Sequence, residues 1–255
     1  MIINGNCVDV MRTIDDNSID LTITSPPYDS LRTYKGYSFD FESIAKDLYR
    51  ITKDGGGVVV WVVGDATIKA SETGTSFKQA LYFKEIGFNL HDTMIYRKLG
   101  PPPLNHRRYE QDFEYMFVLT KGSLKTFNPL KIPCKHAGEK ITGTRRNNGT
   151  DELSPSHGIG GHYNDTKIIG NIWGYYVGNN KSTKDKVAFQ HPATFPEALA
   201  EDHILSWSNP DDLVFDPMCG SGTTLKMAKK NGRRYLGIDV SEEYCDIARQ
   251  RLDLV

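Results

Sequence analysis

Residues 58–63, Val-Val-Val-Trp-Val-Val, form an unbroken apolar run of strand length that leaves few choices of fold. A strand that is apolar on both faces is typical of a parallel sheet covered by helices on each side. Helical patterns flank this run at residues 39–51 and 75–86, and the first ends at Asp54 and three glycines. The chain is therefore predicted to form an α/β sheet that is mainly parallel.

The same alternation of strand and helix patterns returns in the last quarter of the chain. Further strands are predicted at residues 19–24, 90–96, 115–120, 213–216 and 235–239, and further helices at 194–207, 223–230 and 241–252. Between residues 121 and 168 the periodicity disappears, and glycine, polar and basic residues dominate. A patternless stretch of this length indicates either a functional insertion or a disordered flap.

Composition excludes several classes of protein. A length of 255 residues fits one large domain, with or without an insertion, and 38% hydrophobic residues argue against a disordered chain. No apolar run approaches 18 residues, and the first residues do not resemble a secretory signal, so no membrane span and a cytoplasmic location are expected. The cysteines form no C-x-x-C pair, which argues against a disulfide framework or a zinc site; they are Cys7, Cys134, Cys219 and Cys245.

The net charge of −1 conceals an uneven distribution. Residues 121–150 contain seven basic side chains and one acidic side chain, a local balance of +6 that leaves −7 for the rest of the chain. A segment of this kind is either a solvated loop or a surface that faces phosphates.

A glycine loop, Asp216-Pro-Met-Cys-Gly-Ser-Gly-Thr-Thr224, lies between a predicted strand and a predicted helix. It lacks the lysine and the spacing of a phosphate-binding P-loop, and Leu225 stands where a dinucleotide fingerprint requires a third glycine. Asp239 follows at the end of the next predicted strand, where a carboxylate can accept hydrogen bonds from both hydroxyls of a ribose. The loop and this acid together indicate an adenosine-type cofactor; the alternative is an ordinary turn in which Asp239 caps a helix.

A second motif, Ser25-Pro26-Pro27-Tyr28, directly follows the predicted strand at residues 19–24. The prolines end sheet pairing and hold Ser25 and the Pro26 carbonyl rigidly, while Tyr28 offers an aromatic plate. Alone, such a tetrapeptide is equally a strand-terminating turn or a ligand of an aromatic-lined groove.

Together the two motifs resemble the amino-group DNA methyltransferases that use S-adenosylmethionine, in the permuted order of their β group. The segment His191-Pro-Ala-Thr-Phe-Pro196 matches the stretch that precedes the cofactor loop in that family. The resemblance implies a Rossmann-like methyltransferase sheet in circularly permuted order, with an irregular target-recognition insertion. Residues 1–120 would form the catalytic half, 121–174 the insertion and 175–255 the cofactor-binding half of one domain.

The resemblance also assigns roles to residues. The catalytic residues would be Ser25, Pro26, Pro27 and Tyr28. The cofactor-binding residues would be Cys7, Asp9, Phe195, Asp216, Met218, Gly220, Ser221, Gly222, Thr223 and Asp239. Lys131, Lys135, Arg145 and Arg146 would contact DNA, and no metal is expected.

The chemistry implied by the resemblance needs no strong base. An exocyclic amine of cytosine or adenine shares its lone pair with the ring and is a poor nucleophile. Hydrogen bonds accepted by Ser25 and the Pro26 carbonyl would draw the nitrogen toward tetrahedral geometry and aim its lone pair at the methyl group. The base must first leave the duplex, and Tyr28 would stack on it.

Several alternatives remain open at this point. Within the family a serine at position 25 favours cytosine N4 as the target, with adenine N6 as the alternative. RNA or a protein amide would be a more distant substrate, and a nucleotide-binding or DNA-binding module without catalysis is a third hypothesis. Pro133-Cys134 resembles a ring-carbon methyltransferase nucleophile but lies in the polar insertion, away from any glycine motif. Double-stranded DNA is the expected partner; a cognate restriction enzyme and a homodimer are left open.

Overall fold

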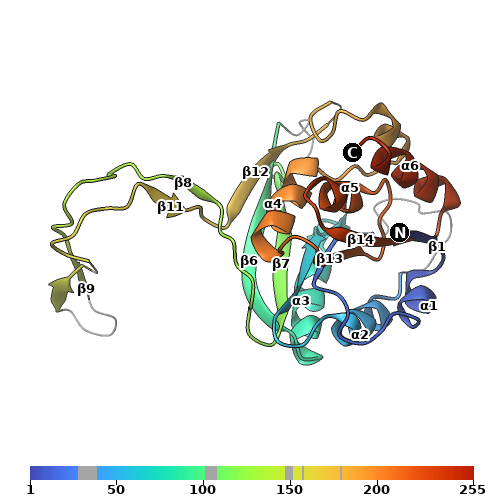
Figure 1. Ribbon diagram of the computed structural model, residues 1–255, viewed down its shortest axis with the longest axis horizontal. Coiled ribbons are helices and arrows are strands. Elements are labelled where there is room, and N and C mark those ends of the chain that lie inside the picture. Colours follow the sequence, from blue (N-terminus) through green and yellow to red (C-terminus); the bar gives the residue numbers. More distant parts are fainter. Residues whose placement is uncertain (28–38, 101–107, 147–151, 157, 179) are drawn as a thin grey trace. The chain divides into compact units, whose positions relative to one another are not determined.

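The computed structural model describes residues 1–27, 39–100, 108–146, 152–156, 158–178 and 180–255. The chain divides into two compact units, which are described separately here (Figure 1). The larger unit comprises Met1–Asn128 and Asn171–Val255, and the smaller unit is Pro129–Gly170. The smaller unit is thus shorter at both ends than the insertion predicted at residues 121–174.

A mixed eight-stranded sheet forms the centre of the larger unit within the described residues, in the order β1-β14-β13-β2-β3-β7-β6-β12. The strands are β1 (Ile2–Asn4), β2 (Leu21–Thr24), β3 (Gly57–Val63), β6 (Asn89–Leu99), β7 (Phe113–Lys121), β12 (Ile172–Tyr176), β13 (Leu213–Asp216) and β14 (Arg234–Asp239). Only β7 runs antiparallel to its two neighbours, β3 and β6. The prediction of a mainly parallel α/β sheet is therefore confirmed. A short hairpin, β4 (Thr67–Ile68) with β5 (Ser71–Glu72), follows β3.

Helices cover both faces of this sheet. They are α1 (Cys7–Met11), α2 (Phe41–Ile51), α3 (Thr75–Glu85), α4 (Glu197–Trp207), α5 (Thr223–Lys230) and α6 (Glu242–Leu252), with a 3-10 turn η1 (Lys186–Gln190). Figure 1 shows α1, α2 and α3 on one side of the sheet and α4, α5 and α6 on the other. Among the described residues, no helix is long and apolar enough to cross a membrane.

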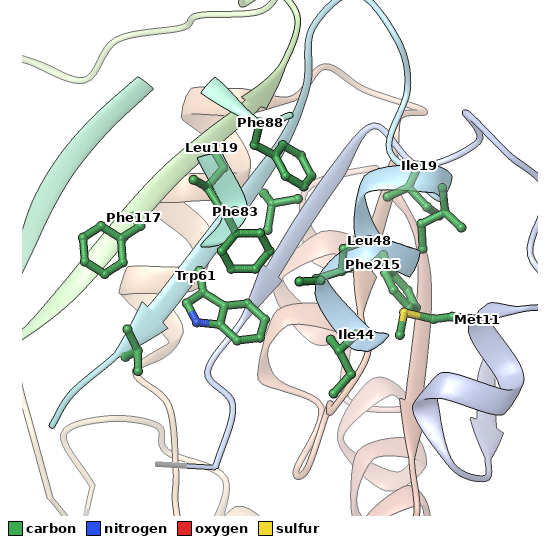
Figure 2. Close-up of a cluster of buried hydrophobic side chains, with 14 of the residues drawn as sticks. Met11, Ile19, Ile44, Leu48, Trp61, Phe83, Phe88, Phe117, Leu119 and Phe215 are labelled. Atoms are coloured by element: carbon green, nitrogen blue, oxygen red, sulfur yellow. The ribbon is translucent and has the colours of Figure 1, made fainter. Parts of the chain in front are cut away.

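The core between the sheet and α1–α3 is built around the apolar run of β3 (Figure 2). All seven residues of β3 are buried, as a strand covered on both faces requires. The Trp61 ring packs edge-on against Phe83, with ring centroids 5.2 Å apart, and its Nε1 donates to Gln79 Oε1 at 2.8 Å. Burial of one such large side chain contributes about 2–3 kcal/mol, so the run fixes the centre of the fold.

Several elements of the larger unit were not predicted from the sequence, among them β4, β5 and η1. β1 and α1 are too short for a periodic pattern, and β12 reads Ile-Trp-Gly-Tyr-Tyr in a glycine-rich context. Helix α4 also begins three residues later than predicted. Pro196 is its N-cap with extended backbone, and a residue before proline, here Phe195, is disfavoured in a helix.

The smaller unit is a two-stranded antiparallel ribbon. β8 (Lys131–Pro133) pairs with β11 (Thr166–Ile168), and β9 (Thr144–Arg146) pairs with β10 (Leu153–Pro155). A bridge between Lys140 and His162 joins the two ladders. Residues 129–170 are called the ribbon below.

Candidate active site at the carboxyl edge of the sheet

The two sequence motifs follow neighbouring strands that are almost 200 residues apart in the chain. β2 and β13 are parallel and paired, with Thr22 opposite Phe215. The chain leaves β2 through α2 to reach β3 on one side, and leaves β13 through α5 to reach β14 on the other. The order of the strands reverses between β2 and β13, and open α/β sheets bind ligands beside the carboxyl ends of strands at such a point.

Hydrogen bonds join the glycine loop to the end of β2, directly before the second motif. The Thr24 hydroxyl, just before Ser25, donates to Asp216 Oδ1 at 2.8 Å, and the Thr224 hydroxyl donates to the Ile23 carbonyl at 3.2 Å. Asp216 Oδ1 also accepts from the backbone N–H of Met218 at 3.1 Å. Burial raises the pKa of Asp216 to about 7, although the bond from Thr24 opposes this shift. Each motif therefore helps to fix the position of the other.

The glycine loop adopts a conformation that only glycine accommodates without strain. Gly220 and Gly222 have φ angles of 48° and 75° in the left-handed region. A Cβ on Gly220 would lie 2.8 Å from His191 Nε2, and one on Gly222 would lie 2.6 Å from the Ala248 Cβ. The glycines are thus required for the turn itself and for the approach of His191 and α6.

Asp239, at the end of β14, holds the loop from one side. Its Oδ2 accepts from the Gly220 N–H at 2.8 Å, and its Oδ1 accepts from the Ser241 N–H at 2.9 Å. Ser241, not Asp239, caps α6 by accepting from the Tyr244 N–H, so the helix-cap interpretation of Asp239 is wrong. Burial raises the pKa of Asp239. An ionised carboxylate has about four acceptor positions, and three backbone N–H groups bond to this one, which leaves capacity for a further donor such as a ribose hydroxyl.

The N-terminal segment reaches the same edge of the sheet. Asn4 of β1 pairs opposite Asp239, and the Gly5 N–H donates to the Asp239 carbonyl at 2.9 Å. Cys7 follows, half-buried; burial raises its pKa to about 11, and the negative charge of Asp239 adds to the shift. Asp9 differs from Cys7, because it is exposed and forms a surface ion pair with Arg12 at 3.5 Å.

The segment 191–196 lies against the glycine loop and α6, through contacts of His191 with Gly220 and Tyr244. The His191 ring packs against Tyr244 with centroids 4.3 Å apart, and its Nδ1 lies 2.8 Å from the Ala193 carbonyl oxygen and 3.1 Å from the Ala193 backbone nitrogen. His191 therefore holds the segment 191–196 against Tyr244 and Gly220. Phe195 is half-buried in the same segment.

The structure describes most, but not all, of the predicted catalytic motif. Ser25 and Pro27 are half-buried and Pro26 is buried, directly beyond β2. Tyr28 lies outside the described residues. Thr24 was missed by the sequence reasoning; its place next to the motif on a strand end was the available signal.

The DNA-contact candidates fall in the ribbon. Lys131 begins β8, Lys135 follows that strand, and Arg145 lies in β9; all three are exposed. Arg146 closes β9, and its side chain is not described. None of the described residues of the ribbon is buried.

The ribbon carries less positive charge than the +6 counted for residues 121–150. Lys121, counted in the +6 segment, belongs to the larger unit and is only 8% exposed; its Nζ pairs with Asp54 at 3.0 Å and donates to Asn17 Oδ1 at 2.8 Å. The ribbon itself holds six basic and four acidic residues, a net charge of +2. The positive excess lies in residues 129–150, with five basic residues and one acidic residue, whereas residues 151–170 carry a net −2.

No group of three or more His, Cys, Asp or Glu side chains within the described part of the chain is arranged to hold a metal ion. The acidic groups at the carboxyl edge are instead engaged by backbone N–H groups and hydroxyls, as described above for Asp216 and Asp239.

Comparisons with known proteins agree with this geometry. Residues 19–250 match the family N6_N4_Mtase, described as DNA methylase. The chain is 57% identical over 244 residues to the orphan methyltransferase M.BamHII of Bacillus amyloliquefaciens, covering 94% of this chain and 91% of that relative. Among solved structures, PvuII DNA methyltransferase (cytosine-N4-specific) superposes with a TM-score of 0.68 at 20% identity, covering 99% of this chain and 92% of that one. The M1.HpyAVI–SAM complex superposes with a TM-score of 0.63 at 22% identity, covering 99% and 98%.

Proposed function

The chain belongs to the N6_N4 family of DNA methylases and is an S-adenosylmethionine-dependent DNA methyltransferase, and we propose that it methylates N4 of cytosine at a specific sequence in double-stranded DNA. The observation that carries this proposal is the junction of the two motifs at the β2–β13 switch point, where Thr24 donates to Asp216. A methyl donor and a target amine must meet within about 3–3.5 Å, and neighbouring strand ends offer that proximity.

The residues at this edge fit the cofactor. Asp239 offers carboxylate lone pairs to the ribose hydroxyls, and the Gly220–Gly222 turn presents backbone where a side chain has no room. The carboxyl groups of Asp239 and, where it is ionised, Asp216 place negative charge at this edge, which suits a cationic sulfonium. When bound, S-adenosylmethionine supplies an electrophilic methyl group. Cys7, Asp9, Phe195, Met218, Ser221 and Thr223 are proposed to complete the cofactor site.

The catalytic motif is proposed to act on the amine by hydrogen bonding. Ser25 and the Pro26 carbonyl would accept hydrogen bonds from the two amino hydrogens, with Pro27 keeping the turn rigid. Tyr28 would stack on the flipped base and offset part of the few kcal/mol of unstacking. The proton of the methylated amine would leave to solvent afterwards.

Cytosine N4 is proposed over adenine N6 because of Ser25. The PvuII enzyme, whose name states cytosine-N4 specificity, shares the fold at 20% identity and is consistent with this choice. Adenine N6 remains the alternative. An RNA or a protein amide as substrate is disfavoured by the match to a family of DNA methylases.

Target recognition is proposed to lie in the ribbon. Its exposed backbone edges and the basic residues Lys131, Lys135, Arg145 and Arg146 suit a DNA groove, into which a two-stranded ribbon fits. A homodimer remains a proposal. The 57% identical relative is named an orphan methyltransferase, which favours action without a cognate restriction enzyme.

One assay tests the reaction and the target base together. Purified protein is incubated with labelled S-adenosylmethionine and unmethylated genomic DNA, which is then digested to nucleosides. Label in N4-methyldeoxycytidine is expected. Label in N6-methyldeoxyadenosine would overturn the choice of base, and the absence of label from DNA would overturn the proposed activity.

A variant pair tests the catalytic motif. Tyr28→Ala should lower turnover about a hundredfold while cofactor affinity stays within twofold, because stacking on a base contributes about 1–3 kcal/mol. Tyr28→Phe keeps the ring and should retain most turnover. Equal turnover in the Tyr28→Ala variant and the natural protein would remove Tyr28 from the site.

A further inference from the structure

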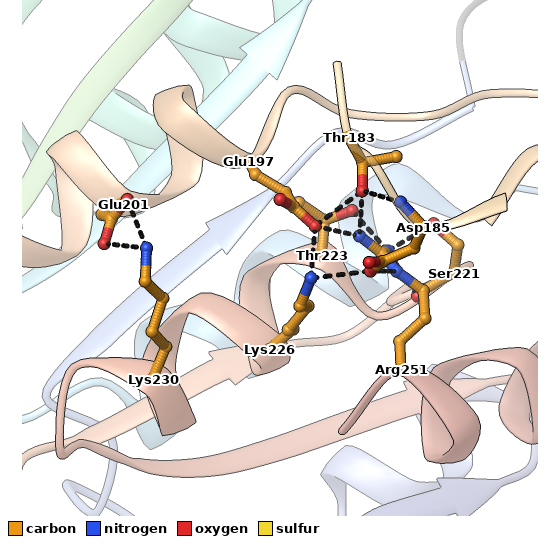
Figure 3. Close-up of polar contacts among 9 residues, drawn as sticks. All are labelled: Thr183, Asp185, Glu197, Glu201, Ser221, Thr223, Lys226, Lys230 and Arg251. Carbon is orange, nitrogen blue, oxygen red and sulfur yellow. Dashed lines mark hydrogen bonds and ion pairs between the residues drawn. The ribbon is translucent and has the colours of Figure 1, made fainter. Parts of the chain in front are cut away.

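A buried ionic cluster contacts the glycine loop at Ser221 and Thr223. Two cations, Lys226 of α5 and Arg251 of α6, share two carboxylates, Asp185 and Glu197 (Figure 3). Arg251 is fully buried and Lys226 is 7% exposed. Burying four charges is costly unless each is paired and hydrogen-bonded, so the arrangement needs a reason beyond stability.

Arg251 reaches the loop, whereas Lys226 does not. The Nη1 of Arg251 donates to the Ser221 carbonyl at 2.8 Å, to the Ser221 hydroxyl at 3.1 Å and to the Thr223 hydroxyl at 2.9 Å. Its Nε donates to Asp185 Oδ2 at 2.9 Å, and its Nη2 donates to Glu197 Oε1 at 2.6 Å. Lys226 Nζ donates to the same two carboxylate atoms, Asp185 Oδ2 at 2.7 Å and Glu197 Oε1 at 2.8 Å.

These contacts connect three separate segments of the chain. Asp185 precedes η1, Glu197 opens α4, and the segment 191–196 between them carries His191, which packs on Gly220. The planar guanidinium has donors in fixed directions, so it can fix the loop and both carboxylates at once; an ammonium group cannot. The sequence offered a signal, because Arg251 lies on the buried face of α6 with Ile247 and Ala248.

We propose that Arg251 is a positioning residue for the cofactor site. Arg251 donates to the Ser221 carbonyl, and Asp239 accepts from the Gly220 N–H. Together these two hydrogen bonds fix the loop in its cofactor-binding conformation. The inference rests on the proposed cofactor role of residues 216–224. A loop that is held in place before binding costs less to order when the cofactor arrives, so loss of this contact lowers cofactor affinity.

Two matched variants separate positioning from general stability. Arg251→Met and Lys226→Met each remove one cation from the same cluster, so both should lower the melting temperature to a similar extent. Only Arg251→Met should weaken S-adenosylmethionine binding, by at least tenfold in Kd measured by calorimetry. Its KM for the cofactor should rise in parallel, while kcat at saturating cofactor should change less than threefold.

Two further variants keep the test decisive if Arg251→Met does not fold. Arg251→Lys keeps the charge but loses the fork, so it should recover stability while its cofactor Kd stays at least fivefold raised. Thr183→Val removes an acceptor of Arg251 that lies outside the loop and outside the proposed cofactor residues, so it should change the Kd less than twofold; a loss as large as that of Arg251→Lys would overturn the role of the loop contact. Hydrogen exchange of residues 218–224 should be faster in the Arg251 variants and unchanged in Lys226→Met.

The outcomes distinguish this inference from its premise. An unchanged cofactor Kd in Arg251→Lys, or an equal loss of affinity in Lys226→Met, would overturn the positioning role. Failure of the natural protein to bind S-adenosylmethionine, or an unaltered Kd in Asp239→Ala, would instead overturn the proposed cofactor site.

Discussion

The glycine loop and the ribbon differ most in how far each is surrounded by protein. From Gly220 to Lys226 every residue is buried, and the loop is bonded to β14 and to α6. In the ribbon no described residue is buried, and the pairing of two strands is its main organisation. A reaction needs atoms held within fractions of an ångström, whereas reading a DNA groove needs exposed edges. The buried glycine loop and the exposed ribbon fit the reaction and the DNA contact that are proposed for them.

The composition and exposure of the ribbon support its proposed contact with DNA. An isolated two-stranded hairpin is only marginally stable in water. Large apolar side chains such as Leu153, Ile168 and Ile132 are 66%, 53% and 43% exposed. Its basic excess lies before residue 151 and its acidic excess after it. We therefore expect DNA to contact chiefly the first half of the ribbon.

Removal of the ribbon is the largest perturbation. The Ile169 N–H donates to the Leu130 carbonyl at 3.1 Å, so the two ends lie together and a short glycine linker can replace residues 129–170. Methylation of DNA at low enzyme concentration should fall by roughly a thousandfold or more, the usual margin of specific over non-specific binding. Cofactor Kd should stay within twofold. Retention of sequence-specific methylation would place target recognition outside the ribbon.

Neutralising its basic residues should have the next largest effect. Glutamine at positions 131, 135, 145 and 146 should weaken DNA binding about a hundredfold at low salt and reduce the slope of log K against log salt by about 3–4. Lys167→Gln, on the return strand β11, is the matched control and should change the slope by less than one. A normal salt slope in the fourfold variant would show that these side chains do not meet phosphates.

The sequence predicted the larger unit well because its elements carry strong local patterns. The apolar run of β3 and the spacing of α2 each specify one element, and the structure contains both. β1 was missed because three residues carry no period, and its strand exists through pairing with β14. The ribbon was missed for a related reason: its short strands are exposed on both faces, so no alternation of apolar and polar residues marks them.

The residues of the candidate site also differ in how well the sequence identified them. Asp216 and Asp239 could be identified because each ends a strand beside a glycine motif. Thr24 and Arg251 were missed because their local signals were weak and their contacts are with partners 192 and 28–30 residues away in the sequence. Lys121 shows the opposite error. Its charge was counted with the neighbouring basic segment, although Lys121 forms an ion pair with Asp54 in the larger unit.

Loss of the Asp239 carboxylate tests the buried glycine loop as the proposed cofactor site. Asp239→Ala should raise the cofactor Kd roughly 10- to 100-fold, since hydrogen bonds to a charged group contribute about 1.5–3 kcal/mol. DNA affinity should remain unchanged. Asp246→Ala, on the exposed side of α6 where it pairs with Arg249, is the control and should leave both affinities intact. A cofactor Kd that does not move in Asp239→Ala would contradict the proposed ribose contact.

The smallest expected effect concerns pH and again separates the two units. His203 of α4 is fully buried; its Nδ1 accepts from Trp207 Nε1 at 3.0 Å, and burial lowers its pKa to about 3. The unfolded chain protonates this histidine below about pH 6.5 while the folded protein does not, so stability falls as the pH decreases. From pH 6.5 to 5 this contribution is roughly 1.5 kcal/mol.

His203→Asn keeps an acceptor for Trp207 and should lose that part of the pH dependence of the unfolding free energy, measured by urea unfolding. The opposite contribution of Asp216, whose raised pKa makes the protein more stable as the pH falls from 7, cancels when the variant is compared with the natural protein. The protein without the ribbon should keep the full dependence, because His203 belongs to the larger unit; a weaker dependence there would mean that the ribbon contributes to the stability of the sheet.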